Sequence, residues 1–141
     1  MAWKEFDYSC LSTRTNLEYR PYVRVIVRVQ KELSLYAIID SGCQTTMINS
    51  EVAPLLGVSL ASCKKVLVGG VGKGEQKGYQ TTLEIEVPDC KTSFISPVIF
   101  ANLPADMLLG QDAFFEHFHI LFEGNVKKFK LNRITRIKNV Q

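Results

Sequence analysis

Asp40 is the residue of this 141-residue chain best placed to do chemistry, because of what stands on either side of it. The apolar residues 37–39 lead into Asp40, Ser41 and Gly42 then break the run, and the apolar and β-branched sequence TTMI follows. Asp and Gly are common turn formers, so a plain hairpin turn is one interpretation. A turn with apolar chain on both sides would instead hold the carboxylate near the core, where it is costly unless hydrogen-bonded or chemically used. The tripeptide alone leaves both interpretations open.

A glycine cluster is the second candidate feature, in the stretch LVGGVGKGEQKG. A phosphate-binding loop would need a Gly-Lys-Ser/Thr ending and a helix to receive the phosphate, and the sequence predicts neither. The alternating residues YQTTLEIEV follow instead, which indicates a hairpin with a glycine-rich tip. Such a hairpin is either a lid over a site or only a flexible surface loop.

The stretch MLLGQD is the third feature, and it predicts a core strand that ends abruptly before a short helix. His117 and His119 are the two histidines of the chain, which gives little support to a metal site or to a Ser-His pair. The cysteines, at 10, 43, 63 and 90, form no CxxC pair, so we expect reduced thiols, no metal and no cofactor.

Composition and charge are those of a soluble globular domain, with 46% hydrophobic and 22% charged residues. The net charge of +3 arises mainly near the C-terminus, from Lys127, Lys128, Lys130, Arg133, Arg136 and Lys138. We interpret this run as a solvated edge strand or tail. The alternative hypothesis is a barrel that binds nucleic acid through these basic residues. The start MAWKEFDYSC lacks the apolar region of a secretory signal, and no run reaches the roughly 18 apolar residues of a membrane helix. We therefore expect a cytoplasmic or otherwise intracellular protein that binds neither membranes nor nucleic acid.

The elements that must position these features are mostly short strands. Strands are predicted at 22–29, 33–40, 45–49, within 64–87, at 92–100 and within 119–131, and short helices at 49–57 and 111–118. Asn49 or Ser50 would cap the first helix and Gly57 would end it. The first twenty residues show no clear period. The pattern predicts one domain with an all-β, compact, closed barrel-like fold and one or two short helices.

The order of the three features resembles that of the retroviral-type (retropepsin-like) aspartic proteases, over roughly residues 22–131. AIIDSG is similar to the catalytic loop of that family, GGVG to its flap tip, and LLG to the element that crosses behind its active site. The resemblance implies the retropepsin (acid protease) fold for a domain at 21–132. It leaves a basic tail at 133–141 and an N-terminal extension at 1–20, which is a candidate part of the dimer interface.

The chemistry of this family needs two carboxylates around one water, and the pair shares one proton. This chain contains a single Asp-[Ser/Thr]-Gly sequence, at Asp40. The resemblance therefore implies a homodimeric aspartic endopeptidase, in which the Asp40 residues of two copies act on an extended polypeptide. The alternative is a catalytically weak or inactive domain that serves as a peptide-binding or dimerisation module.

The resemblance also implies residue roles. Asp40 would be catalytic, the Ser41 hydroxyl would hold the two loops together across the dimer axis, and Gly42 would let the backbone approach the substrate. The flap tip would consist of Gly69, Gly70, Val71 and Gly72, with the Val71 N–H reaching substrate carbonyls through a bridging water. The substrate pockets and their rim would contain Ile38, Cys43, Gln44, Thr45, Ala105, Asp106 and Leu108.

The chain departs from the viral enzymes at several of these positions. Cys43 stands where the family usually has Ala or Ser, and Gln44 and Thr45 stand where the viral enzymes have acids that grip the substrate. Gln111 replaces an arginine that pairs with one of those acids. Both partners of that ion pair are thus absent. Because this ion pair is absent, we expect a different dimer contact here. The viral enzymes also dimerise through interleaved termini, and the termini of this chain are longer.

Overall fold

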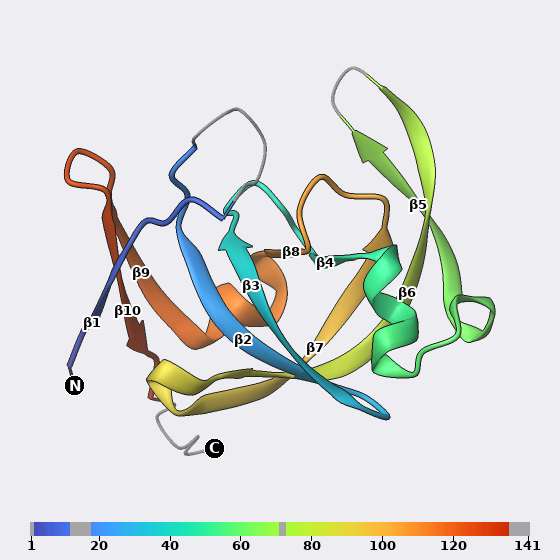
Figure 1. Ribbon diagram of the computed structural model, residues 1–141, viewed down its shortest axis with the longest axis horizontal. Coiled ribbons are helices and arrows are strands. Elements are labelled where there is room, and N and C mark those ends of the chain that lie inside the picture. The colour runs from blue at the N-terminus through green and yellow to red at the C-terminus, as the bar shows by residue number, and fades with distance from the viewer. Residues whose placement is uncertain (1, 12–17, 71–72, 136–141) are drawn as a thin grey trace, which may run out of the picture.

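The computed structural model describes residues 2–11, 18–70 and 73–135 (Figure 1). Its strands are β1 (Lys4–Asp7), β2 (Tyr22–Arg28), β3 (Glu32–Ile39), β4 (Thr46–Asn49), β5 (Lys64–Gly70), β6 (Lys73–Val87), β7 (Thr92–Ala101), β8 (Met107–Leu109), β9 (Phe118–Glu123) and β10 (Lys128–Arg133). The helical segments are short: η1 (Ser50–Leu56), η2 (Leu60–Ser62), η3 (Pro88–Cys90) and η4 (Gln111–Phe115). None of the helices in the described ranges is long and apolar enough to cross a membrane.

The larger sheet closes into a barrel. Its strand order is β2-β3-β8-β4-β7-β6-β5, and β2 also pairs with β6, so that six of the seven strands form a ring. Two pairs of strands in this ring are parallel, β3 with β8 and β4 with β7. The Asp-Ser-Gly sequence directly follows β3, and β8 contains the two leucines of the Leu-Leu-Gly sequence. The predicted all-β closed barrel is confirmed.

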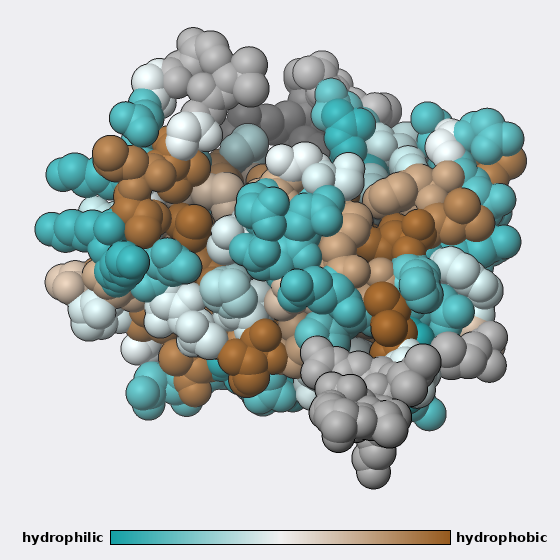
Figure 2. Space-filling model, turned by 180° about the vertical axis from the view of Figure 1, so that it is seen from behind, coloured by the Kyte–Doolittle hydropathy of each residue, from teal (hydrophilic) through white to brown (hydrophobic). Residues whose placement is uncertain are grey.

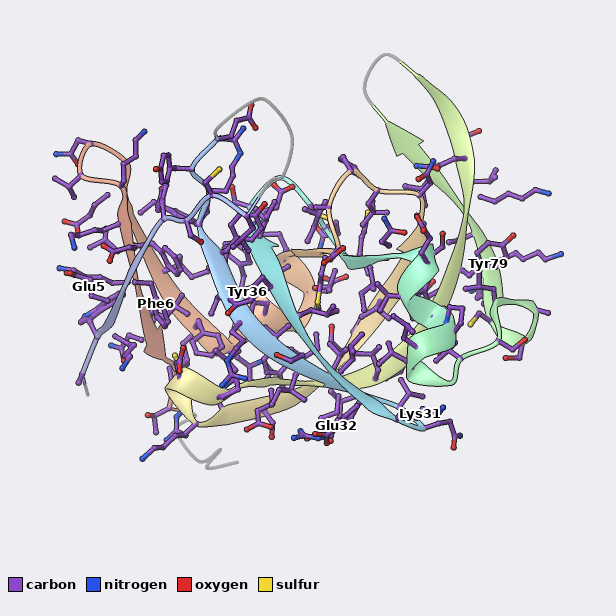
Figure 3. All side chains as sticks on the ribbon, viewed as in Figure 1. Glu5, Phe6, Lys31, Glu32, Tyr36 and Tyr79 are labelled. Atoms are coloured by element: carbon purple, nitrogen blue, oxygen red, sulfur yellow. The ribbon has the colours of Figure 1, made fainter. Side chains whose placement is uncertain are left out.

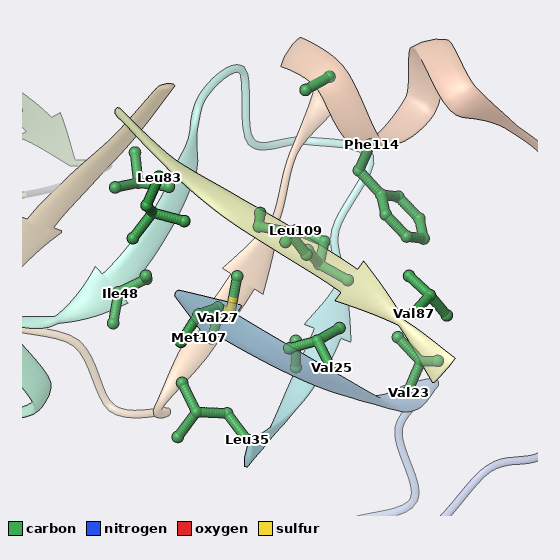
Figure 4. Packing of buried hydrophobic residues seen from close by; sticks show 14 of the residues in the cluster. Val23, Val25, Val27, Leu35, Ile48, Leu83, Val87, Met107, Leu109 and Phe114 are labelled. Carbon is green, nitrogen blue, oxygen red and sulfur yellow. The ribbon is translucent and has the colours of Figure 1, made fainter. Parts of the chain in front are cut away.

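The core follows from the alternation seen in the sequence. Val23, Val25 and Val27 on β2 are at most 1% exposed, and they pack with apolar side chains of β3, β4, β6 and β8 inside the barrel (Figure 4). On the outer face of the same strand, Arg28 forms ion pairs with Glu32, Glu84 and Glu86, at 2.9, 3.5 and 2.6 Å. This cluster lies where β2 meets β6, so charge pairs accompany the closure of the barrel.

A second sheet, with the strand order β1-β10-β9, contains a strand that the sequence did not indicate. β1 has the sequence KEFD, which is too short to show an alternating pattern, and its pairing with β10 makes it a strand. Phe6, labelled in Figure 3, fixes it there by stacking on Phe129 with ring centroids 4.9 Å apart. The N-terminal segment is therefore bound to its own chain.

The two predicted helices have different outcomes. The first is a 3-10 helix capped by the Asn49 side chain, which accepts a hydrogen bond from the Glu51 N–H, and Gly57 ends it at φ = 75°. A short helical segment is present where the sequence predicted one at 111–118, since residues 111–117 are helical in their hydrogen bonding and β9 begins at Phe118. It is kinked and not a regular helix, because Ala113 has φ = 67° and Asp112 also departs from helical geometry. The Glu116 side chain accepts a hydrogen bond from the Ala113 N–H at 2.9 Å, which holds the kink.

We predict that Phe6→Ala will release β1 from the sheet. The change removes the stacked pair with Phe129, and we expect the free energy of unfolding to fall by about 2 kcal/mol. Denaturant unfolding measures the loss, and hydrogen exchange should show weaker protection in β10. The control is Tyr19→Ala, because Tyr19 is 54% exposed and its loss should cost less than about 0.5 kcal/mol. Unchanged protection of β10 would contradict the prediction.

Candidate active site

Asp40 lies where a buried strand leaves the barrel. β3 and β8 run parallel, with Ile38 opposite Leu108 and Ile39 opposite Leu109. The Asp40 N–H continues this ladder by donating to the Leu109 carbonyl at 2.9 Å. The side chain is half-buried. The carboxylate is therefore carried to the rim of the core by regular strand pairing, as the sequence indicated.

The turn after Asp40 fixes the carboxylate. The Gly42 N–H donates to Asp40 Oδ1 at 2.9 Å, and the Cys43 N–H donates to the Asp40 carbonyl at 3.2 Å. A Cβ atom at Gly42 would lie 3.4 Å from Asp40 Oδ1, which is an ordinary contact. Space within this chain therefore does not by itself require glycine at position 42, and the predicted need for close approach to a substrate stays a prediction.

The loop is held from behind by the residues that follow β8. The Gln111 N–H donates to the Cys43 carbonyl and the Asp112 N–H to the Gln44 carbonyl, both at 2.8 Å. The Gln111 side-chain amide donates to the Ser41 carbonyl, also at 2.8 Å. These bonds need Gly110, because a Cβ atom there would lie 2.6 Å from the Cys43 oxygen. The glycine of the Leu-Leu-Gly element thus lets two backbone segments meet.

Asp112 completes this contact with its side chain. The Gln44 amide donates to Oδ1 at 2.7 Å, and the Thr45 hydroxyl donates to Oδ2 at 3.1 Å. The loop therefore supplies two neutral donors and the segment after β8 supplies the charge. The sequence alone gave Asp112 no role, because it lies outside the Asp-Ser-Gly sequence. The pair of donors at 44 and 45 was the available signal that an acceptor was needed.

Cys43 is a hydrogen-bond donor in this loop. Its Sγ lies 2.9 Å from the Thr45 carbonyl oxygen, and the side chain is half-buried. Burial raises the pKa of the Cys43 thiol, and the neighbouring charges of Asp40 and Asp112 raise it further. The thiol is therefore protonated near neutral pH, which suits its role as a donor.

The predicted flap corresponds to the hairpin of β5 and β6, which projects from the barrel (Figure 1). Gly70 pairs with Lys73 at its end, whereas Val71 and Gly72 lie outside the described residues. A Cβ atom at Gly69 would meet none of the described residues within 4 Å, but one at Gly78 would lie 2.6 Å from Ile99 Cγ2. Position 69, near the end of the hairpin, therefore has space for a side chain, whereas position 78 is tightly packed.

The residues predicted to form pockets occupy two places. Ile38 and Leu108 are half-buried neighbours on β3 and β8, next to Asp40. Ala105 and Asp106 belong to the loop before β8, which Asn49 anchors: its N–H donates to the Asp106 carbonyl at 2.8 Å, and its side chain lies 3.4 Å from the Ala105 carbonyl. Of the remaining predicted residues, Ser41 is exposed, and the side chains of Gln44 and Thr45 bind Asp112 as described above.

The basic run near the C-terminus and the possible metal ligands are the other candidate features of the sequence. Lys128 pairs with Glu5 and Asp7, and Lys130 lies 3.6 Å from Glu123, so acids of the same sheet neutralise part of the basic run. Within the described ranges, no three His, Cys, Asp or Glu side chains come together in a way that could hold a metal ion.

Comparisons with known proteins agree with this geometry. A family model described as retroviral aspartyl protease matches residues 17–117. The chain is similar to the solved structure of a retropepsin-like aspartic protease from Rickettsia conorii, with a TM-score of 0.63 and 19% identity over 94% of this chain and 92% of that one. It is also similar to the EIAV protease in complex with the inhibitor HBY-793, with a TM-score of 0.52 and 22% identity over 70% and 88% of the two chains.

A third similar structure is the retroviral protease-like domain of Ddi1 from Leishmania major. Its TM-score is 0.50, with 19% identity over 82% of this chain and 94% of that one. Comparison with the sequences of curated proteins gave no match.

We predict that Asp112→Ala will loosen the loop that carries Asp40. Gln44 and the half-buried Thr45 lose their shared acceptor, and we expect the free energy of unfolding to fall by about 2 kcal/mol. Denaturant unfolding measures the loss. Asp89→Ala is the matched control, because Asp89 is exposed and no hydrogen bond of its side chain is seen among the described residues. An equal effect of the two changes would contradict the assigned role of Asp112.

The raised pKa of Cys43 leads to a prediction about its reactivity. Only the thiolate is alkylated, so the alkylation rate of Cys43 should rise with pH around a midpoint that is higher in the folded protein than in the urea-unfolded chain. Iodoacetamide labelling followed by peptide mass spectrometry measures both midpoints. A folded-state midpoint equal to or below the unfolded one would show that burial and the two carboxylates do not act on this thiol as described.

Proposed function

Because this chain belongs to the retroviral aspartyl protease family, we propose that it is a homodimeric aspartic endopeptidase that cleaves extended polypeptides. One observation carries the proposal. The Asp40 carboxylate is held by the Gly42 N–H at the end of a core strand, on a loop that Gln111 and Asp112 fix from behind. A half-buried carboxylate on a loop whose backbone is fixed by so many bonds favours a catalytic role over a plain turn.

The chemistry requires a second carboxylate, which we assign to Asp40 of a second copy. Two carboxylates about 3 Å apart cannot both ionise, so one carries a proton and the other is charged. The charged group takes a proton from a water molecule, whose oxygen attacks the scissile carbonyl. The protonated group donates to the carbonyl oxygen. The tetrahedral intermediate then collapses, the C–N bond breaks, and the leaving nitrogen receives a proton.

Substrate binding is assigned to the surfaces around this pair. The hairpin of β5 and β6 supplies the flap, with the tip at Gly69, Gly70, Val71 and Gly72. Ile38 and Leu108 flank Asp40 with half-buried apolar side chains, which suits apolar residues beside the cleaved bond. The catalytic domain would span residues 21–132, with Ser41 holding the two loops together across the dimer axis.

The first test is Asp40→Asn. We expect this change to abolish cleavage of an unfolded polypeptide at about pH 4 to 7, because the amide cannot act as the base. The circular dichroism spectrum and the unfolding midpoint should stay close to those of the wild type. A variant that cuts as fast as the wild type would overturn the assignment of Asp40, and a wild-type dimer without pepstatin-sensitive cleavage would favour the alternative of a binding or dimerisation module.

Mixing the two proteins tests whether the site is shared. In an equal mixture that exchanges subunits freely, only about a quarter of the dimers carry two intact Asp40 residues. We expect the activity per total protein to fall to about a quarter of the wild-type value. A fall to only one half would show that each chain acts alone.

A further inference from the structure

A cavity lies between the second sheet and the barrel, away from Asp40. Its volume is about 320 Å³, and its walls are the start of β1, the end of β10 and η3, the turn that joins β6 to β7. In Figure 1 this turn is drawn in yellow near the lower ends of β1 and β10, whereas β3 runs upward to the rim that carries Asp40. The volume is at the lower end of the range of small-molecule sites. The cavity is therefore separate from the candidate active site.

The register of β1 and β10 decides which side chains face this cavity. Lys4 lies opposite Leu131 on the neighbouring strand, and Arg133 follows Leu131 by two residues, so the three side chains share one face of the sheet. Leu131 is buried and supplies apolar surface, whereas Lys4 and Arg133 are exposed. All three line the cavity. This face of the sheet therefore presents two cations beside an apolar floor.

The charges on the opposite face of these two strands are matched within the sheet, by the ion pairs of Lys128 and Lys130 described above. In the part of the chain that the structure describes, no ion pair is seen for Lys4, Lys91 or Arg133, the cations that line the cavity. Unmatched cations around a hollow raise the local concentration of anions.

The other wall of the cavity is η3 and the residue after it. Asp89, Cys90 and Lys91 line it in succession, and the Lys91 N–H ends η3 by donating to the Pro88 carbonyl at 3.0 Å. The Cys90 thiol is half-buried. Burial raises the pKa of this thiol, Asp89 raises it further, and Lys4 lowers it. Lys4 on β1 therefore lies close to the thiol on η3, and the two walls face each other.

We propose that this cavity binds a small organic anion, in which a carboxylate or phosphate group is joined to a short apolar body. The lining contains three cations and one acid. The planar guanidinium of Arg133 can bind either anionic group through two parallel hydrogen bonds, and Lys4 and Lys91 add point charges. The apolar body would lie on Leu131 and Cys90. This site goes beyond the proposed peptidase activity and does not rest on it.

The surface around the cavity suits a ligand of this mixed kind. Figure 2, which views the molecule from behind, shows hydrophobic and hydrophilic surface interleaved on the side where β1, β9 and β10 lie in Figure 1. A small inorganic ion would leave the apolar floor uncovered, and a neutral apolar molecule would leave the cations unmatched. An anion with an apolar body satisfies both parts of the lining.

NMR titration with phenyl phosphate and with benzoate tests the site, because each probe joins one anionic group to a ring. We expect saturable amide shifts at Lys4, Leu131 and Lys91 with at least one probe, and the tighter probe identifies the preferred anionic group. Inorganic phosphate carries only the charge and benzyl alcohol only the ring, so both should bind at least about tenfold more weakly. No saturable shift with either probe, or inorganic phosphate binding as tightly as phenyl phosphate, would overturn the proposal.

Three matched substitutions locate the charges that bind the probe. Lys4→Gln and Arg133→Gln should each raise the dissociation constant of the tighter probe about fivefold or more, since each removes a cation from the cavity. Lys64→Gln is the control, because Lys64 is an exposed lysine on β5, and it should leave the constant as it is. All three side chains are exposed, so the unfolding midpoints should stay at the wild-type value. Unchanged constants for both Lys4→Gln and Arg133→Gln would contradict the proposal.

Cys90 reports occupancy of the cavity without any substitution. The bound probe should slow the alkylation of Cys90 by iodoacetamide, whereas Cys63, at the end of η2, should react at the same rate with and without it. Peptide mass spectrometry measures both rates. Equal rates at Cys90 with and without saturating probe, or equal slowing of the two thiols, would show that the probe binds elsewhere.

The two proposed sites can be tested apart. Asp40→Asn should bind the probe with the wild-type constant, because Asp40 does not line the cavity. Binding that persists in a protein without peptidase activity would support the cavity and reject the enzyme. Binding that is lost in Asp40→Asn would overturn the assignment of the probe to the cavity.

Discussion

The contact between the Asp40 loop and the segment after β8 is the constraint on which the rest of the site depends. It brings two irregular backbone segments close enough that a Cβ atom at Gly110 would lie 2.6 Å from the Cys43 oxygen. This close approach lets the carbonyl groups of Ser41, Cys43 and Gln44 accept hydrogen bonds from Gln111 and Asp112. Without these donors the carbonyl groups would have no strand partner, because they lie in a turn. The barrel brings β3 and β8 side by side, but this contact is what gives the loop a single shape.

The electrostatics of the contact are arranged around Asp112. Its charge is matched by the neutral donors Gln44 and Thr45, so the loop is fixed without a buried cation. Burial raises the pKa of the Cys43 thiol, and the charges of Asp40 and Asp112 raise it further. The cysteine next to Asp40 therefore serves as a protonated hydrogen-bond donor. The residues that depart from the viral pattern, at 43, 44, 45 and 111, are therefore parts of one arrangement.

Sequence reasoning predicted the barrel and the place of Asp40 because both follow from alternation and turn residues, which are local signals. It missed β1, since a strand with the sequence KEFD exists only through its distant partner β10. It predicted the short helical segment at 111–118 but not its kink at Asp112 and Ala113, which Glu116 and contacts with the Asp40 loop hold in place. The donors at 44 and 45 indicated that an acceptor was needed, but the acceptor, Asp112, lies 68 and 67 positions away, and a single sequence does not show such a pairing.

The joint arrangement of Gln44, Thr45 and Asp112 also limits how this chain can change over generations. Replacing Thr45 or Asp112 alone leaves a part-buried donor or acceptor without its partner in the protein, so either single step carries a cost in stability. A change to the arrangement of the viral enzymes, with acids on the loop and an arginine after β8, would need several substitutions. Together they would be tolerated, but one at a time they would not. Lineages with either arrangement would thus be separated by less stable intermediates, and each would tend to stay with the solution it has.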